Sequence, residues 1–460
     1  MRRTVVLDVV GLTPSLLGDD TPHLREFEQR GGGARPLVPP LPAVTCSAQA
    51  SMLTGASPRD HGIVGNGWYF RDVAEVSLWK QSNHLVGGEK LWDAARRRDG
   101  AFRCAKLFWW FNMYSSVDVS VTPRPIYAAD GLKLPDIYTD PPELRDELTR
   151  RLGPFPLFDF WGPRAGIRSS EWIARCARHV FDAYVPTLTL AYLPHLDYDL
   201  QRHGPHDART GAALRAIDAV CGELIEHVER KGARVIVLSE YGITPVEKPV
   251  HVNRALREAG LLRVRDELGT EKLDAGASEA FALADHQIAH VYVRREERVE
   301  EVRALLANLD GVERVLDGEG KRGARLDHPR AGELVAVASS DAWFTYYFWQ
   351  DDARAPDYAR TVDIHRKPGY DPVELFVDPT LRFPALRVGM RLAQKALGMR
   401  YLMDVVPLDA SLVRGSHGRL PEHAREGPLL MTSTPELLPR GALHASDVKA
   451  IVSSHVFDRD

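Results

Sequence analysis

A threonine in the segment Pro42–Asn66, PAVTCSAQASMLTGASPRDHGIVGN, stands where its hydroxyl could act as a nucleophile. Prolines before it favour an extended lead-in, and the run CSAQASMLTG after it suits a helix, so we expect Thr45 at a helix N-terminus. Unpaired N–H groups and the positive end of the helix dipole would stabilise a phosphate and a developing alkoxide there. An ordinary threonine N-cap would show the same local pattern.

Acidic residues follow three apolar runs elsewhere in the chain. Asp8 ends the first run, Asp197 lies in LPHLDYD after the third, and Glu240 lies in SEYG after the fourth. A single acid after a strand is usually a loop or cap residue. Three such strand ends favour a shared site, because ligands of parallel α/β sheets bind beyond the carboxyl ends of the strands.

The elements that would position these residues are the strands and helices of an α/β core. Helical patterns lie between the apolar runs, most clearly at residues 207–231 and 171–184. This alternation predicts a parallel sheet with helices on both faces. The predicted strands are Thr4–Val10, Arg103–Phe108, Thr187–Leu193 and Arg234–Leu238.

Two stretches break the alternation. Residues 112–168 are rich in proline and aromatic residues, and we interpret them as an irregular insert or lid near the site. Residues 271–385 contain a predicted strand at His290–Val293, a helix at Arg298–Leu309 and the runs GVERVL and GELVAVAS, which suggest an inserted α+β cap subdomain. Residues 1–270 and 386–460 would then form the catalytic core.

Composition excludes several classes of protein. The 460 residues include 59 Lys+Arg and 63 Asp+Glu, so the net charge of −4 gives no sign of a nucleic-acid polymer as partner. No apolar run reaches the roughly 18 residues of a membrane span. The 4 cysteines form no CxxC motif. We expect a cytoplasmic protein with a small-molecule substrate, and the sequence leaves its oligomeric state open.

These segments together resemble the alkaline phosphatase superfamily, most closely its nucleotide pyrophosphatase/phosphodiesterase (type I phosphodiesterase) branch. The resemblance also covers the segment from Asp197 to Gly204-Pro205, SEYG, and a late GSHG around His417. It implies an α/β three-layer sandwich with a mostly parallel central sheet, and the second insert is similar to the cap of phosphonoacetate hydrolase-like members. The residues that fit the branch's nucleophile motif are Pro42, Thr45, Ser51, Thr54, Gly55, Pro58, His61, Gly62, Ile63 and Asn66.

The resemblance implies a metal-dependent phosphohydrolase of the phosphodiesterase or nucleotide pyrophosphatase type. Thr45 would attack phosphorus in line, and water would resolve the phospho-enzyme, while Asn66 would donate to a phosphate oxygen. One or two divalent ions, zinc by resemblance, would stabilise the attacking and leaving oxygens. The metal ligands implied by the resemblance are Asp8, Thr45, Asp197, Glu240 and His417.

Two implied ligand positions carry unexpected residues. Gln201 stands where a histidine is expected four residues after Asp197, and Tyr241 stands where the Asp-His pair has its histidine. Both are poor zinc ligands. The site could instead hold Mn²⁺ or Mg²⁺ through oxygen atoms. Alternatively a nearby histidine could fill in, with His203 the first choice and His195, His251 and His286 behind it; Tyr241 could also donate to the substrate.

Two further segments offer substrate contacts. Trp109 and Trp110 could stack on a flat group, although a core strand with its exit loop explains them equally well. Arg366 and Lys367 could contact an anion, although a solvated basic turn also explains them.

Two other functions remain open at this point. The altered ligands would suit a non-catalytic binding protein that has lost a metal site. The scaffold would also suit another ester hydrolase, acting on phosphomonoesters, phosphonates or sulfate esters. Cys46 is followed by Ser-Ala-Gln and lacks the C-x-[PA]-x-R context of a sulfatase nucleophile, which disfavours the sulfate ester.

Overall fold

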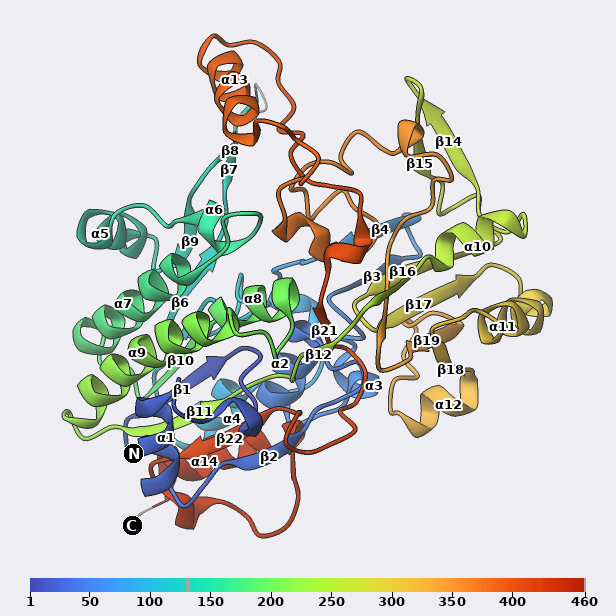
Figure 1. Ribbon diagram of the computed structural model, residues 1–460. Helices are drawn as coiled ribbons and strands as arrows, with labels where there is room; N and C mark the ends of the chain where they lie inside the picture. The colour runs from blue at the N-terminus through green and yellow to red at the C-terminus, as the bar shows by residue number, and fades with distance from the viewer. Residues whose placement is uncertain (130–132, 459–460) are drawn as a thin grey trace.

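A nine-stranded sheet runs through the centre of the molecule (Figure 1). The computed structural model describes residues 1–129 and 133–458. Five neighbouring strands are parallel and include all four strands predicted from the sequence, which are buried throughout because their runs are apolar. In order, the strands are β23 (Leu443–His444), β2 (Arg35–Val38), β22 (Leu429–Thr432), β11 (Arg234–Leu238), β1 (Thr4–Val9), β10 (Leu188–Leu193), β5 (Cys104–Leu107), β6 (Val119–Pro123) and β9 (Ile137–Asp140).

Two groups of helices pack on this sheet (Figure 1). The first group is α1 (Pro22–Arg30), α7 (Ile167–Ala183), α8 (His195–His203) and α9 (Thr210–Glu229), with α7 against β10 and α9 against β11. The second group is α2 (Thr45–Thr54), α4 (Leu91–Arg98) and α14 (Val448–Phe457), with α14 against β1. The predicted α/β fold with a mostly parallel sheet is confirmed.

Strand register brings the carboxyl ends of three central strands together. Asp8 on β1 pairs with Tyr192 on β10 and with Leu238 on β11. Glu240 and Tyr241 follow β11 directly, and Asp197 lies in the first turn of α8 just after β10. The three predicted acids therefore start from neighbouring positions at one edge of the sheet.

A second, antiparallel sheet lies beside the core. Its order is β16 (Ala280–Asp285), β17 (Ile288–Val293), β19 (Leu334–Ala338) and β18 (Val312–Leu316), and α11 (Val299–Ala307) and α12 (Gly318–Gly323) flank β18. The strand and helix predicted at 290–293 and 298–309 are present. The hydrophobic cluster of this sheet also includes Val250 and Leu256, which precede residue 271. The division of the chain at 271 and 385 stays a prediction.

The segment 112–168 is more regular than predicted. It contributes β6 and β9 to the edge of the main sheet, and it also contains β7 (Ile126–Tyr127), β8 (Lys133–Leu134), α5 (Glu143–Leu152) and α6 (Leu157–Phe160). Prolines and short lengths hide these strands in the sequence. Pairing within the main sheet stabilises β6 and β9, and β7 and β8 pair with each other. Residues 130–132 of this segment lie outside the described residues, and a role as a lid stays a prediction.

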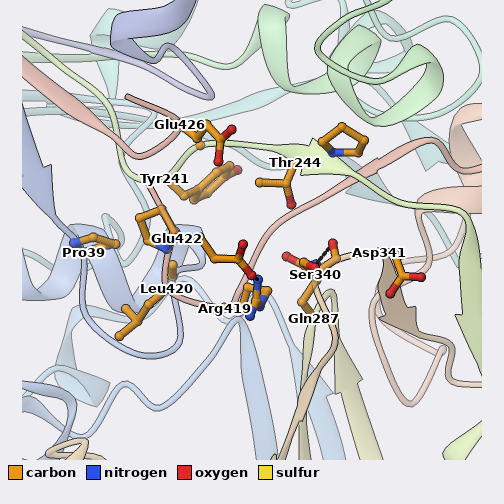
Figure 2. A pocket seen from close by; sticks show the side chains of 14 residues that line it. Pro39, Tyr241, Thr244, Gln287, Ser340, Asp341, Arg419, Leu420, Glu422 and Glu426 are labelled. Atoms are coloured by element: carbon orange, nitrogen blue, oxygen red, sulfur yellow. Dashed lines mark hydrogen bonds and ion pairs between the residues drawn. The ribbon is translucent and has the colours of Figure 1, made fainter. Parts of the chain in front are cut away.

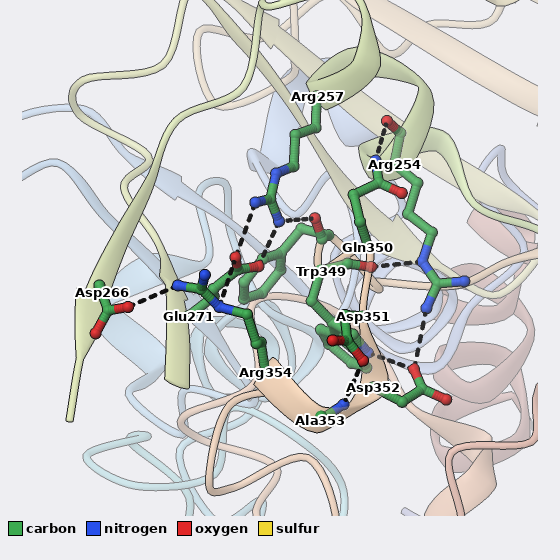
Figure 3. A network of polar contacts seen from close by, with 11 residues as sticks. Arg254, Arg257, Asp266, Glu271, Trp349, Gln350, Asp351, Asp352, Ala353 and Arg354 are labelled. Carbon is green, nitrogen blue, oxygen red and sulfur yellow. Dashed lines mark hydrogen bonds and ion pairs between the residues drawn. The ribbon is translucent and has the colours of Figure 1, made fainter. Parts of the chain in front are cut away.

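The remaining elements connect these layers. Within the described chain, no helix is both long enough and apolar enough to span a membrane. Arg257 donates to Glu271 at 2.9 Å, and Arg354 lies 3.3 Å from the same carboxylate (Figure 3). These contacts connect the hairpin that carries Glu271 to the segments of Arg257 and Arg354. The connecting elements are α3 (Pro58–His61), β3 (Gly67–Phe70), β4 (Glu75–Leu78), β12 (Thr244–Pro245), β13 (Lys248–Val250), α10 (Val252–Glu258), β14 (Val264–Glu267), β15 (Thr270–Leu273), β20 (Ala342–Phe344), α13 (Pro384–Ala396) and β21 (Gly415–Ser416).

Candidate active site

Thr45 is the first residue of α2, and its side chain is buried. Val44, with extended backbone angles (φ −130°, ψ 156°), occupies the N-cap position, so the alternative of an ordinary threonine N-cap is wrong. Asn66 satisfies the helix end instead, because its Oδ1 accepts from the Cys46 N–H at 3.0 Å. The Thr45 hydroxyl is thus left to face Tyr241, whose hydroxyl lies 3.3 Å away.

Gln49, one helical turn after Thr45, holds two carboxyls together. Its Nε2 donates to Asp8 Oδ2 at 3.2 Å and to Glu240 Oε1 at 2.5 Å. Its Oε1 accepts from the backbone N–H of Trp110 at 2.7 Å, and this bond determines which end of the amide faces the acids. A neutral amide therefore joins two carboxyls that come from neighbouring strands.

The Asp8 and Glu240 carboxyls have raised pKa values. Burial raises the pKa of Asp8 to about 7. Burial, and then the nearby charge of Asp8, raise the pKa of Glu240 well above its ordinary value. One oxygen of each, Asp8 Oδ1 and Glu240 Oε2, has no hydrogen-bond partner among the described residues. Two adjacent buried acids of this kind need a proton or a cation to offset their charge.

Asp197 has neutral donors on both of its oxygens. Its Oδ1 accepts from the Tyr241 hydroxyl at 3.1 Å, and its Oδ2 accepts from Gln201 Nε2 at 2.7 Å. Gln201 is held in turn by Tyr370, whose hydroxyl donates to Gln201 Oε1 at 3.1 Å. Burial raises the pKa of Asp197 to about 7. The hydroxyl of Tyr241 therefore bridges Thr45 and Asp197.

Four rings form a stacked column beside this network. Tyr241 lies on His417 with centroids 3.5 Å apart, His417 lies 3.6 Å from His286, and His286 lies 3.7 Å from Tyr370. His417 Nδ1 is 2.9 Å from the carbonyl oxygen of Ala43, which can only accept, so Nδ1 carries the proton. Burial lowers the pKa of His417 to about 3, which keeps the ring neutral with an unprotonated Nε2.

Asn66, the predicted phosphate contact, is bound at both ends of its amide. Its Oδ1 caps α2, its Nδ2 donates to Asp285 Oδ1 at 2.9 Å, and its backbone N–H donates to Asp285 Oδ2 at 2.8 Å. Burial raises the pKa of Asp285 to about 6. One hydrogen of Nδ2 remains for a substrate.

Several other predicted site residues lie elsewhere or have other partners. His203 is half-buried at the end of α8, where its charged neighbours are Arg209, Asp199, Asp207 and Arg202. Arg366 is exposed and pairs with Asp363 at 2.5 Å. Lys367 is buried and lies 2.7 Å from both Asp371 and Glu374, so its charge is already matched.

The two predicted tryptophans differ in their surroundings. Trp109 is buried in the main hydrophobic core. Trp110 packs against Trp79 with centroids 4.7 Å apart and ring planes inclined by 41°, and its backbone N–H donates to Gln49 in the site. Of the pair, only Trp110 is joined to the predicted site by a hydrogen bond among the described residues.

The residues present fit one cation position better than two. In the described chain, no three His, Cys, Asp or Glu side chains surround one point in a way that could hold a metal. Asp8 and Glu240 nevertheless offer unpartnered oxygens, and the Thr45 hydroxyl lies near Glu240, which together make an oxygen-rich donor set. Asp197, Gln201 and His417 fit a second cation less well, because an amide and a phenol hydrogen-bond the two Asp197 oxygens and neither group is a ligand that zinc prefers.

A cavity of about 230 Å³ opens next to this site (Figure 2). Ala43 and Tyr241 form its wall towards the site, and Arg419 and Glu422 line another part of it. The cavity thus reaches the residue that bridges Thr45 and Asp197.

The family model described as type I phosphodiesterase / nucleotide pyrophosphatase matches residues 4–371 of the chain. The chain belongs to this family. An uncharacterised pyrophosphatase/phosphodiesterase of Schizosaccharomyces pombe is 26% identical over 237 residues, covering 49% of this chain and 41% of that protein. Ectonucleotide pyrophosphatase/phosphodiesterase 1 of Saccharomyces cerevisiae is 22% identical over 281 residues, covering 54% of this chain and 35% of that protein. Each match therefore spans less than half of the curated relative.

Solved structures show the same fold over nearly the whole chain. Phosphonoacetate hydrolase from Sinorhizobium meliloti, in complex with phosphonoformate, has a TM-score of 0.62 at 15% identity and covers 99% of this chain and 96% of its own. Murine ectonucleotide pyrophosphatase/phosphodiesterase 5, an inactive variant in complex with AMP, has a TM-score of 0.59 at 14% identity and covers 99% and 95%. These neighbours confirm the predicted alkaline-phosphatase-like fold.

Proposed function

We propose that the chain is a hydrolase of phosphodiester or pyrophosphate bonds in small molecules, with Thr45 as the nucleophile. The observation that carries the proposal is the Thr45 hydroxyl at the start of α2, which lies 3.3 Å from the Tyr241 hydroxyl that donates to Asp197. The position beside the positive end of the helix dipole favours an incoming phosphate and the negative charge that develops on attack.

The hydrogen bonds suggest how Thr45 loses its proton. Thr45 can donate to the Tyr241 oxygen, and Tyr241 donates to Asp197 at 3.1 Å. A proton released by Thr45 would pass along this path to Asp197, whose raised pKa lets it accept a proton near neutral pH. Asn66 would orient the phosphate through its remaining amide hydrogen.

Asp8, Glu240 and Thr45 are the residues that would hold a divalent cation. Bound there, the cation would offset the carboxylate charge and favour the ionised form of the hydroxyl. The donors are oxygens, which favour Mg²⁺ or Mn²⁺ over Zn²⁺.

A non-catalytic binding protein is the second candidate. It is favoured by the hydrogen bonds from Tyr241 and Gln201 to Asp197, because neither group is a ligand that zinc prefers. A panel of p-nitrophenyl phosphodiesters, phosphomonoesters and sulfate esters, assayed with Mn²⁺, Mg²⁺, Zn²⁺ or chelator, separates the candidates. We expect turnover to be fastest with the diesters. Binding of AMP without turnover of any ester under any condition would favour the binding protein.

Thr45→Ala tests the nucleophile. We expect kcat for the best diester to fall by about 10³-fold or more, because the covalent route is lost, and Thr45→Ser to retain part of the activity. A covalent adduct should appear on the peptide containing Thr45 when wild-type protein is quenched during turnover. Its mass should be that of the substrate phosphate with the second ester group retained, because attack on a diester displaces only one alcohol. Because Val44 is the N-cap, Thr45→Ala should leave the thermal unfolding midpoint nearly unchanged. Wild-type rates in Thr45→Ala would rule out the nucleophile.

A further inference from the structure

Helix α13 and the turn after it present apolar side chains to solvent. None of the α13 residues is buried against the described chain. The large apolar residues of this segment are 37% to 75% exposed, which is high for residues of this kind. The exposed apolar residues of this segment are Phe383, Leu386, Met390, Leu392, Leu397, Met399, Tyr401 and Leu402.

The polar face of α13 is paired with Asp404 in the segment that follows the helix. Arg391 lies 3.0 Å from Asp404, Arg387 pairs with the same carboxylate, and Arg391 also donates to Gln394 at 3.0 Å. Leu386, Met390 and Leu397 recur at helical spacing on the other side. An ordinary surface helix has the reverse orientation, with its apolar face on the core. The ion pairs to Asp404 therefore hold the apolar face of α13 outward.

The charge of the segment indicates what could cover this face. Residues 381–402 contain Arg382, Arg387, Arg391, Lys395 and Arg400 and no acidic residue. A second copy of the chain would bring the same excess of positive charge against them, because Asp404 offsets only part of it, and like charges repel. An apolar face flanked by basic residues is typical of a helix that lies in the interface of an anionic membrane.

We propose that α13 docks the protein onto an anionic lipid surface, with its apolar face inserted among the headgroups. Figure 1 shows α13 projecting at the end of the molecule away from β2 and α14, where it is accessible to a flat surface. The hairpin of β7 and β8 projects at the same end, and its Ile126, Tyr127 and Leu134 are exposed. This proposal does not depend on the hydrolase activity.

Flotation with vesicles tests the docking. The full chain is mixed with vesicles of phosphatidylcholine alone or of phosphatidylcholine with phosphatidylglycerol. We expect binding only to the phosphatidylglycerol vesicles, weakened by added salt, and a loss of roughly tenfold or more in partitioning for the triple variant Leu386→Ser, Met390→Ser, Leu397→Ser. The three side chains are exposed, so the variant should unfold at the same temperature as the wild type.

Two control variants separate apolar insertion from charge and from general stickiness. Val73→Ser with Leu268→Ser removes exposed apolar side chains elsewhere and should bind as the wild type does. Arg382→Gln with Arg400→Gln leaves the Asp404 pairs intact and should reduce the preference for phosphatidylglycerol. Equal binding by the serine triple variant and the wild type would overturn the proposal. So would a dimer in solution that the triple variant abolishes without any vesicle binding by the wild type.

Discussion

The phenol ring of Tyr241 lies flat on the imidazole of His417, with centroids 3.5 Å apart and ring planes inclined by 5°. The hydroxyl of the same residue lies between Thr45 and Asp197. Tyr241 thus links the α2 N-terminus, the turn after β10 and the late segment at His417. The sequence resemblance implies a metal-binding histidine at this position, so we expect the phenol to change both the metal chemistry and the proton chemistry of the site.

Tyr241→Phe separates the hydroxyl from the ring. The stack on His417 should survive, while the proton path from Thr45 to Asp197 is cut. We expect kcat for a diester to fall by about 10²-fold with KM nearly unchanged, because the hydroxyl acts on Thr45 and not on substrate affinity. Steady-state kinetics across pH would measure this. An unchanged kcat would show that Thr45 loses its proton by another route.

Gln201→His combined with Tyr241→His should create a second metal position. The two imidazoles would replace the amide and the phenol that hydrogen-bond Asp197, and imidazole is a preferred zinc ligand. Elemental analysis after loading with Zn²⁺ and desalting should find no more than one ion per chain in the wild type and two in the double variant. Gln29→His with Tyr114→His, at exposed positions, is the matched control. Two zinc ions in the wild type would contradict the fit described above.

Gln49→Glu should make the fold depend on a cation. The substitution places a third carboxyl against Asp8 and Glu240, and we expect the metal-free protein to lose about 3 kcal/mol in the free energy of unfolding. Mn²⁺ should raise the unfolding midpoint of this variant more than that of the wild type. Gln29→Glu, on the exposed side of α1, should behave as the wild type does. Equal Mn²⁺ effects in all three proteins would place the cation elsewhere.

Asp285→Asn should change how stability depends on pH. The pKa of Asp285 is raised by burial from 3.8 to about 6, so the folded state holds this proton more tightly than the unfolded state. Its stabilisation is therefore present at low pH and is lost as pH rises from about 4 to about 6, a change of roughly 3 kcal/mol. Urea unfolding of both proteins with chelator present should show the wild type losing this amount relative to the variant. Parallel pH profiles would contradict the prediction.

The sequence was sufficient for the core of the fold and for the proximity of several candidate residues, whose roles stay predictions. The four central strands were predictable because parallel strands buried on both faces are continuous apolar runs. The approach of Asp8, Glu240 and Asp197 to Thr45 followed from the rule on strand carboxyl ends. These features depend on apolar runs and on the order of strands and helices, and both can be read from the sequence.

Other contacts could not be predicted because they join distant segments. Gln49 lies one helical turn after Thr45. Its hydrogen bonds to Asp8 and Glu240 depend on how the strands are arranged in space, which the local sequence does not reveal. Tyr370 donates to Gln201, although the sequence of its segment pointed to Arg366 and Lys367 as the candidate contacts. Lys367 forms ion pairs with Asp371 and Glu374 instead. A basic residue in a sequence does not reveal whether an acid already binds it.

The position of β22 has a consequence for how this polypeptide matures. β22 lies between β2 and β11, and β2 has its sheet partners in β22 and β23 alone among the described strands. Strand β2 leads directly into the segment that carries Thr45, yet its neighbours β22 and β23 begin only at residues 429 and 443. Nascent chains on the ribosome must therefore keep β2 unpaired until residues 429–444 have been synthesised, an interval in which chaperones could protect it from aggregation.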